Sequence, residues 1–267
     1  MTDLLEVWNL RKSFGGVQAL SDCSFTVAEG SIAGLIGPNG SGKTTAFNVI
    51  TGYERADDGR VLLRGRNVTG ARPERVCAFG IGRTFQITRV FGRLTLLENL
   101  RVGGAGVSRE RRRELYADAR CLELLDSVGL AGYARTTAAA LSYGQRKLLE
   151  LVLVLAQEPR IILLDEPAGG INPALVERLG GYIRELNRNG VTFLVVEHNM
   201  EFVMGLCDVI SVMERGSVIA QGSPETVRTD RRVLDAYLGG SLDDEDDEDE
   251  DEDELADNRA GEGGDRR

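Results

Sequence analysis

Residues 37–44 read Gly-Pro-Asn-Gly-Ser-Gly-Lys-Thr and fit the pattern G-x-x-x-x-G-K-[ST]. The glycines let successive backbone N–H groups point at phosphate oxygens, Lys43 reaches the β- and γ-phosphates, and the Thr44 hydroxyl ligates Mg²⁺. An apolar run, 31–36, precedes the loop, and a helical pattern, 44–50, follows it. The chain has only three lysines, which disfavours a chance match. The sequence therefore predicts a strand, a nucleotide-binding loop and a helix in that order.

A second apolar strand ends in two carboxylates. Residues 161–164 are four aliphatics, and Asp165, Glu166 and Pro167 follow them. A buried strand would deliver Asp165 to a metal ion, and Glu166 would orient or deprotonate an attacking water. An isolated Asp-Glu pair usually lies in a solvated loop. Behind a buried strand, in a chain with a phosphate loop, the pair is predicted to be catalytic.

The remaining pattern is typical of an α/β protein. Apolar and polar residues alternate in 4–10 and 19–27, as in half-buried antiparallel strands. Continuous apolar strands separated by helices predict a parallel sheet that is covered on both faces. Further strands are expected over 60–63, 191–196, 210–213 and 217–220, the last two as a closing hairpin. Helices are expected over 142–157, 172–190 and 108–129, the last with Leu115, Ala119, Leu122 and Leu125 on one face.

The formal net charge of −10 is concentrated at one end of the chain. Residues 241–267 hold 15 acidic and three basic residues, whereas residues 1–240 hold 27 acidic and 29 basic ones. We expect 241–267 to be a disordered acidic tail, because it has too little apolar content to fold. Its simplest interpretation is a contribution to solubility or salt tolerance. The alternative is an autoinhibitory polyanion that competes for the phosphate site or docks on a partner's basic face.

Composition also argues against several classes of protein. No apolar run approaches the roughly 18 residues that a membrane-spanning helix needs. The first residues lack the basic region and apolar stretch of a secretory signal. The four cysteines lie 44 or more residues apart without a Cys-x-x-Cys pair, which disfavours a zinc site or a disulfide framework.

Residues 141–145, Leu-Ser-Tyr-Gly-Gln, resemble the signature segment of the ATP-binding subunits of ABC transporters, with Tyr143 in place of a glycine. With the phosphate loop and the Asp165–Glu166 pair, the resemblance extends over residues 4–240. It implies an α/β fold whose P-loop NTPase (RecA-like) core spans about 4–90 and 158–222 and carries an antiparallel β subdomain. An inserted α-helical subdomain would span about 91–157, and 223–240 would form a C-terminal segment.

The resemblance also assigns roles to single residues. Gln86 matches a glutamine that touches Mg²⁺ and senses the membrane partner, and His198, the single histidine, matches a residue that contacts the γ-phosphate. Phe14 is the best match for the aromatic that stacks on adenine, with packing in the core as the alternative. The implied catalytic residues are Lys43, Glu166 and His198, and the implied Mg²⁺ ligands are Thr44, Gln86 and Asp165. The implied ATP-binding residues are Phe14, Gly37, Pro38, Asn39, Gly40, Ser41, Gly42, Lys43, Thr44, Thr45, Gln86, Ser142, Gly144 and Gln145.

The signature segment is expected to form a second anion site. The Ser142 hydroxyl, the bare backbone of Gly144 and the dipole of the helix that starts there would supply it. By resemblance, this site closes over the ATP of the other subunit in a head-to-tail dimer. An ordinary helix cap would explain Ser142 but not the Gly-Gln that follows.

The loop after the carboxylate pair departs from the family pattern. The family usually has Ser-x-Leu-Asp there, and residues 169–172 of this chain are Gly-Gly-Ile-Asn. Asn172 can cap a helix, but it cannot supply a carboxylate across the dimer interface.

Within the family, the detailed resemblance is to one ATPase of the importers for branched-chain amino acids. It rests on 80–86 with the Arg-Val-Phe of 89–91, and on 94–99, 141–145, 165–173 and 197–200. It implies an ATP-hydrolysing subunit, with ATP and Mg²⁺ as cofactors, that acts peripherally at the cytoplasmic face of the cell membrane. The implied partners are permease subunits, which residues 87–91 would face, a second ATPase in a homo- or heterodimer, and indirectly a periplasmic or extracellular solute-binding protein.

Three alternatives stay open. A related importer for urea, short amides or another small solute is the nearest, because the ATPase does not touch the cargo. A soluble ABC ATPase acting on nucleic acid or the ribosome is more remote, since this chain has one module, no heptads and no dominant basic patch. We therefore expect no nucleic-acid partner. A protein that binds ATP without turnover is disfavoured, because Gln86, Glu166 and His198 are all present.

Overall fold

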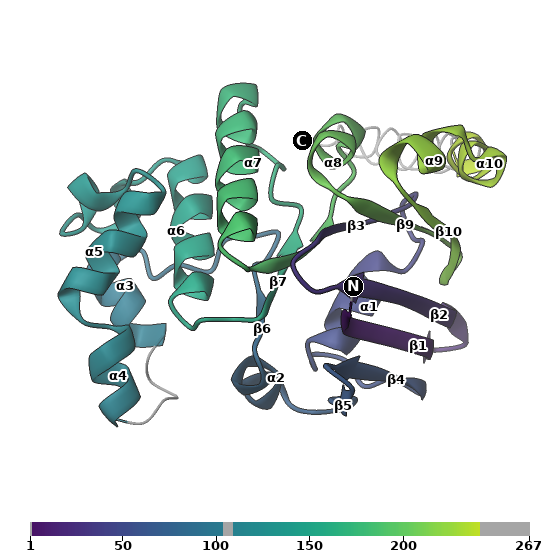
Figure 1. The fold of residues 1–267 in the computed structure, drawn as a ribbon, viewed down its shortest axis with the longest axis horizontal. Coiled ribbons are helices and arrows are strands. Elements are labelled where there is room, and N and C mark those ends of the chain that lie inside the picture. The colour runs from purple at the N-terminus through teal and green to yellow at the C-terminus, as the bar shows by residue number, and fades with distance from the viewer. Residues whose placement is uncertain (1, 104–108, 241–267) are drawn as a thin grey trace, which may run out of the picture.

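The computed structural model describes residues 2–103 and 109–240, so the predicted acidic tail lies outside the described residues. An antiparallel sheet with the strand order β2-β1-β4-β5 forms the lower right of the molecule (Figure 1). In β2 the buried residues Cys23, Phe25 and Val27 alternate with partly exposed ones, which confirms the predicted half-buried strand. The strands of this sheet are β1 (Asp3–Phe14), β2 (Val17–Ala28), β4 (Asp58–Leu63) and β5 (Arg66–Asn67).

A larger sheet has the strand order β10-β9-β3-β8-β7-β6. Its strands are β3 (Ile32–Ile36), β6 (Ile81–Arg83), β7 (Ile161–Asp165), β8 (Thr192–Val196), β9 (Val209–Glu214) and β10 (Ser217–Gly222). Strands β6, β7, β8, β3 and β9 pair in parallel, and β10 pairs antiparallel with β9. The predicted closing hairpin is thus confirmed, and the other strands form the predicted parallel part of the sheet. Arg215 and Gly216 both have positive φ, which makes a tight turn where a parallel strand would need a crossover.

The larger sheet separates two hydrophobic cores. In β7, Ile161 and Leu163 face one core, and Ile162 and Leu164 face the other. The first core also contains α1 (Lys43–Ile50) and the apolar side chains of the antiparallel sheet. The second contains the helices on the opposite face, as predicted for a sheet covered on both sides. Strands β3, β7 and β8 are buried along their whole length, so the residues that follow them start from a fully packed part of the sheet.

Helices pack against both the sheet and one another. The helices next to the larger sheet are α2 (Pro73–Phe79), α7 (Pro173–Arg188), α8 (Met200–Leu206), α9 (Pro224–Thr229) and α10 (Arg231–Gly240). A group at the left of Figure 1, here called the helical lobe, contains α3 (Leu96–Gly103), α4 (Arg109–Leu115), α5 (Asp118–Ser127) and α6 (Tyr143–Leu155). Short 3₁₀ turns, η2 (Ala131–Tyr133) and η3 (Ala138–Ala140), lead into α6. Apolar residues of the lobe and of the sheet share one continuous core.

The single helix predicted over 108–129 is wrong. The chain breaks at Tyr116 and Ala117 into α4 and α5, and residue 108 lies outside the described residues. The break rotates the buried face, so that Ala119 and Leu122 are exposed and Cys121 is buried in their place. Leu115 and Leu125 are buried as expected.

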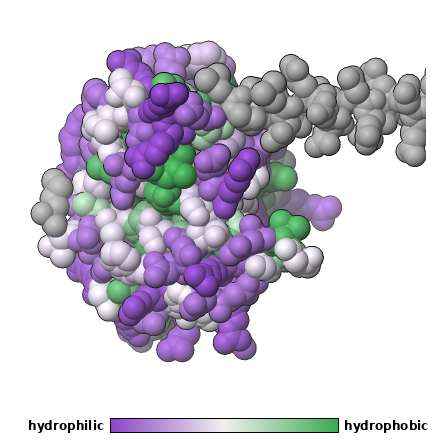
Figure 2. Space-filling view, turned by 90° about the vertical axis from the view of Figure 1, so that its right-hand side faces the viewer, coloured by the Kyte–Doolittle hydropathy of each residue, from purple (hydrophilic) through white to green (hydrophobic). Residues whose placement is uncertain are grey.

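The surface is dominated by polar side chains. Figure 2 shows the face at the right of Figure 1, where a small group of apolar side chains is surrounded by hydrophilic ones. No helix within 2–103 and 109–240 is long and apolar enough to cross a membrane.

Candidate nucleotide-binding and catalytic site

The phosphate loop lies between β3 and α1, as predicted. Gly37 and Gly42 have φ of +152° and +99°, and a Cβ there would lie 2.2 Å from Met213 O and 2.5 Å from Ala19 O. Glycine is therefore required sterically at both positions. Helix α1 begins at Lys43 without a side-chain cap and without an acidic residue in its first turn. Its first N–H groups and its dipole are thus suited to an anion.

The Lys43 ammonium lies over the loop. Its Nζ donates hydrogen bonds to the carbonyl oxygens of Gly37 and Pro38, both at 2.8 Å, and to Ser41 Oγ at 3.3 Å. Burial lowers the pKa of Lys43, and the nearby Glu166 carboxylate opposes that shift. The loop therefore places one positive charge where phosphate oxygens would lie.

A cavity of about 210 Å³ opens over the loop. Its lining residues are Ala19, Asn39, Gly40, Ser41, Gly42, Lys43, Thr44, Thr45, Glu166 and His198. All of them except Ala19 are predicted site residues, so the fold brings together segments from opposite ends of the sequence.

Glu166 has a strained backbone that several bonds hold in place. Its φ is +45°, a conformation that costs a non-glycine residue about 1 kcal/mol or more. Its N–H donates to Val196 O at 2.9 Å, and its carbonyl oxygen accepts from Lys147 Nζ at 2.6 Å and from the Gly169 N–H at 3.2 Å. These bonds connect Glu166 to β8, to α6 and to its own loop. The direction of its side chain is therefore determined by the fold.

Two more predicted residues converge on the same carboxylate. Gln86 Nε2 donates to Glu166 Oε2 at 2.8 Å, and His198 Nδ1 lies 3.9 Å from that oxygen. The His198 side chain is 65% exposed and lines the cavity. An acid, an amide and an imidazole thus meet beside the phosphate loop.

Asp165 is paired with a residue that the sequence analysis did not single out. Arg83 Nη2 donates to Asp165 Oδ2 at 2.7 Å, and the two side chains are 7% and 9% exposed. Arg83 also donates to Asn48 Oδ1 and Thr51 Oγ1 of α1 and its C-terminal cap. Its guanidinium lies near three aromatic rings, those of Phe47, Tyr53 and Phe85. Arg83 therefore connects the end of β7 with α1.

The donor set near the loop fits Mg²⁺. Thr44 lines the cavity with its hydroxyl, whereas the carboxylate of Asp165 and the amide of Gln86 do not line it. Gln86 bonds the cavity-lining Glu166 through its amide nitrogen, which leaves its oxygen for a cation. Hard oxygen ligands of this kind, few in number and completed by phosphate oxygens, are what Mg²⁺ prefers.

The signature segment forms a complete helix cap. The Gln145 N–H donates to Ser142 Oγ at 3.2 Å, and Gln145 Oε1 accepts the Ser142 N–H at 2.9 Å. A Cβ on Gly144 would lie 2.0 Å from Leu175 Cδ2 of α7. An ordinary helix cap therefore does explain Gly144 and Gln145, contrary to the prediction. The capping box accounts for Gln145, and packing against α7 accounts for Gly144. None of these residues lines the cavity over the phosphate loop.

The loop that departs from the family pattern ends in a helix cap. Asn172 Oδ1 accepts the Leu175 N–H at 2.9 Å at the start of α7, as predicted. Phe14 lies at the end of β1, is 45% exposed and has Lys12 Nζ 4.9 Å from its ring centroid. Its exposure rules out the core-packing alternative, although Phe14 does not line the phosphate cavity.

Buried charged residues were missed by the sequence analysis. Glu197 is fully buried, and its carboxylate accepts N–H groups from Ala168 at 2.6 Å and from His198 at 3.2 Å. Lys147 and Glu150 are buried on α6, beneath the site. The available signal was a charged residue inside an apolar run, which 148–156 contains at Glu150.

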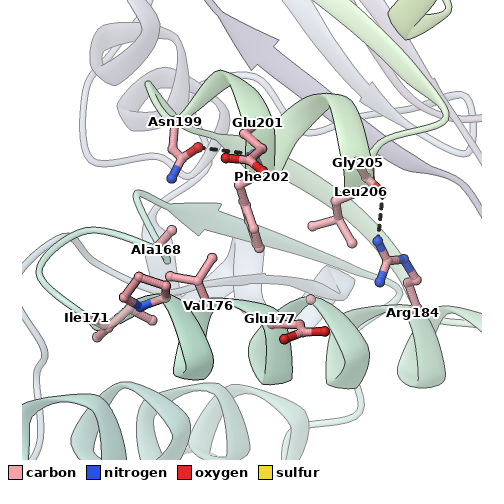
Figure 3. Close-up of a pocket in the computed structure, with 12 residues that line it drawn as sticks. Ala168, Ile171, Val176, Glu177, Arg184, Asn199, Glu201, Phe202, Gly205 and Leu206 are labelled. Atoms are coloured by element: carbon pink, nitrogen blue, oxygen red, sulfur yellow. Dashed lines mark hydrogen bonds between the residues drawn. The ribbon is translucent and has the colours of Figure 1, made fainter.

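A larger groove, of about 560 Å³, lies away from this chemistry between α7 and α8 (Figure 3). Phe202 and Leu206 point into it from α8, and Val176 faces them from α7. The Arg184 guanidinium at its end donates to Gly205 O. Its lining mixes apolar side chains with charged and polar ones and carries none of the predicted catalytic residues. Size alone therefore does not locate the site.

Two family models match the sequence of this chain. A family model described as ABC transporter matches residues 20–169, more than half of the chain. A second model, described as branched-chain amino acid ATP-binding cassette transporter, matches residues 217–243.

Similar curated proteins include LivG of Salmonella typhimurium, a high-affinity branched-chain amino acid transport ATP-binding protein. It is 38% identical over 88% of this chain and 98% of its own length. BraF of Pseudomonas aeruginosa, described in the same words, is 37% identical with the same coverage. Among solved structures, the ADP conformation of MJ1267, an ATP-binding cassette of an ABC transporter, has a TM-score of 0.81 at 34% identity. The match covers 90% of this chain and all of that one.

Proposed function

The chain belongs to the ABC transporter family as an ATP-hydrolysing subunit, and on that premise we propose that it powers the import of branched-chain amino acids. The observation that carries the catalytic assignment is the convergence of Gln86 and His198 on the Glu166 carboxylate beside the phosphate loop. The relatives named for branched-chain amino acid transport support the cargo. Import of urea, short amides or another small solute is the alternative.

Hydrolysis requires the chain to hold the phosphates and to activate a water. The N–H groups at the start of α1 and the Lys43 ammonium hold the β- and γ-phosphates, and His198 contacts the γ-phosphate. Glu166 accepts a proton from the attacking water, whose oxygen forms a bond to the γ-phosphorus while the bond to the β–γ bridging oxygen breaks. ADP and inorganic phosphate leave. Catalysis is therefore mostly positioning and charge stabilisation.

Thr44, Gln86 and Asp165 would hold Mg²⁺. When bound, the ion neutralises charge on the β- and γ-phosphates. Arg83 orients the Asp165 carboxylate through its 2.7 Å contact.

The working unit is proposed to be a dimer on a membrane permease. Ser142, Gly144 and Gln145 begin α6 at the surface and would close over the ATP of a second ATPase subunit, identical or different. A related ATP-binding cassette has been solved as a dimer with ADP and phosphate. Ile87 and Phe91 are 80% and 54% exposed beside Gln86 and would contact the permease. The chain would then lie at the cytoplasmic face of the membrane, with a solute-binding protein on the other side and no nucleic-acid partner.

Replacing Glu166 by Gln tests the catalytic assignment. Gln keeps the size and the polarity of the side chain but cannot accept the proton, so we expect kcat to fall by about 10²–10⁴-fold while ATP still binds. Phosphate release and the affinity for a fluorescent ATP analogue measure the two quantities. We further expect the Glu166→Gln protein to accumulate as a dimer with ATP in size-exclusion chromatography.

Glu177→Gln, the same change at an exposed position of α7, is the matched control and should leave kcat unchanged. Turnover at the wild-type rate in Glu166→Gln would show that another group activates the water.

A further inference from the structure

Helix α6 carries two buried charged side chains beneath the candidate site. Lys147 and Glu150 are 8% and 5% exposed, and the other buried side chains of the helix are aliphatic. They are three residues apart and therefore lie on the same face of the helix, one turn from each other. Burying a charge costs free energy unless the charge is paired or hydrogen-bonded, so the partners of each side chain show what keeps it buried.

The two side chains bond to different segments of the site. Lys147 Nζ donates to the carbonyl oxygen of Glu166 at 2.6 Å. Glu150 Oε1 accepts the backbone N–H groups of Phe85 and Arg89, both at 3.3 Å. Phe85 and Arg89 stand on either side of Gln86. One turn of α6 thus contacts both the segment that carries Gln86 and the residue that Gln86 touches.

The surroundings of Glu150 contain few other charges. Lys147 lies on its own helix, Arg89 belongs to the bonded segment, and Asp165 lines the same small cavity of about 20 Å³. Burial raises the pKa of Glu150 to about 7, against the two backbone N–H groups and the two cations, which lower it. At pH 8 the side chain is therefore mostly ionised and accepts both N–H groups as a carboxylate.

We propose that Glu150 is a positioning residue for ATP hydrolysis. It holds residues 85–89 against α6, so that the Gln86 amide stays 2.8 Å from the Glu166 carboxylate. Lys147 bonds the backbone of Glu166, the other partner of that contact, so α6 supports both Gln86 and Glu166. Because α6 also begins with the signature segment, the helix that would meet a second subunit is bonded directly to the Gln86 segment. The inference rests on the roles proposed for Gln86 and Glu166.

Deuterium uptake tests the contact without any turnover. In the full chain at pH 8 without nucleotide, we expect Glu150→Ala to speed exchange in a peptide covering 84–91 by about tenfold, because two amides lose their acceptor. Glu150→Gln keeps an amide oxygen and should stay within about threefold of wild type. Leu148→Ala, a buried apolar change on the same helix, is the control for general loosening and should leave this peptide unchanged. Equal uptake in Glu150→Ala and wild type would overturn the proposal.

Kinetics test the consequence. We expect Glu150→Ala to lower kcat about tenfold, with ATP affinity within twofold of wild type, and Glu150→Gln to restore most of the loss. Leu148→Ala should keep the wild-type kcat even if it lowers the stability of the fold. In a double-mutant cycle, adding Glu150→Ala to Gln86→Ala should cause no further loss, since Glu150 acts through Gln86.

Fully additive losses, or a fall in ATP affinity instead of kcat, would overturn the positioning role. An unaltered kcat in Gln86→Ala alone would instead contradict the role proposed for Gln86. That result is distinguishable, because the deuterium experiment reports on the contact independently.

Discussion

Lys43 and Lys147, two of the three lysines of the chain, both place their ammonium groups on backbone carbonyl oxygens of the site. The single histidine, His198, lies beside Glu166, whose backbone carbonyl oxygen accepts the bond from Lys147. These contacts fix loops that have no regular secondary structure of their own. At the scale of the residue, the site is therefore built by charged side chains that bond to the backbone, and not only by the glycines of the loop.

Arg83 should be essential to the fold as well as to the site. Arg83→Met keeps apolar volume among the aromatic rings but leaves Asp165 as an unpaired buried charge, since its side chain is only 9% exposed. We expect a destabilisation of about 3 kcal/mol. The midpoint of urea unfolding measures it.

The double variant Arg83→Met/Asp165→Asn removes both charges. It should recover most of that stability and remain inactive, because Asp165 is gone. If Arg83→Met alone unfolds at the wild-type urea concentration, the pairing with Asp165 contributes no stability and the assignment fails.

At the scale of the element, the local sequence pattern was sufficient to predict a strand where one or both of its faces are buried. The strands around 161–164 and 191–196 and the loop at 37–44 lie where the sequence predicts them. Helix 108–129 is divided because Tyr116 and Ala117 interrupt it, and periodicity alone does not show where a turn re-aims the buried face. The short strand β6 and helix α8 were missed, since three or seven residues give too little periodic signal.

The residues of the candidate site likewise fall into those that the sequence predicts and those that it does not. Residues that belong to a contiguous motif could be named from the sequence. Arg83, Glu150 and Glu197 could not, because each bonds to a distant partner, Asp165, Phe85 and Ala168 respectively, that only the fold brings close.

The buried Glu150 predicts an unusual pH dependence of stability. Its pKa is raised from 4.5 to about 7 in the folded chain, so between these values the folded state binds the proton more tightly than the unfolded chain. The stability that this group contributes is full below pH 4.5 and is lost as the pH rises to 7, up to about 3 kcal/mol. Gln has no such loss. We therefore expect Glu150→Gln to gain stability relative to wild type as the pH rises from 5 to 8.

Urea unfolding of both proteins at pH 5, 6, 7 and 8 measures that difference, with Glu123→Gln on the exposed surface of α5 as the control. A difference that is flat with pH, or that changes in the opposite direction, would mean that Glu150 has an ordinary pKa.

At the scale of the whole molecule, one hydrophobic core connects the helical lobe to the larger sheet. The Gln86 segment and its exposed residues Ile87 and Phe91 lie between them in the sequence, and Glu150 bonds that segment to the lobe. This arrangement would let a permease pressing on the exposed pair act on the glutamine beside Glu166. Residues 1–240 are close to neutral, and the negative charge of the chain belongs to 241–267, which no part of this mechanism uses.

ATP-driven uptake in proteoliposomes, with the chain reconstituted on its permease, second ATPase and solute-binding protein, tests the central claim most directly. We predict uptake of labelled leucine that requires internal ATP and is lost when Glu166→Gln replaces the wild-type chain. Labelled urea and acetamide, offered in parallel, should not accumulate. Uptake of urea or acetamide without leucine would contradict the proposed cargo, and leucine uptake that persists with Glu166→Gln would contradict the proposed catalytic site.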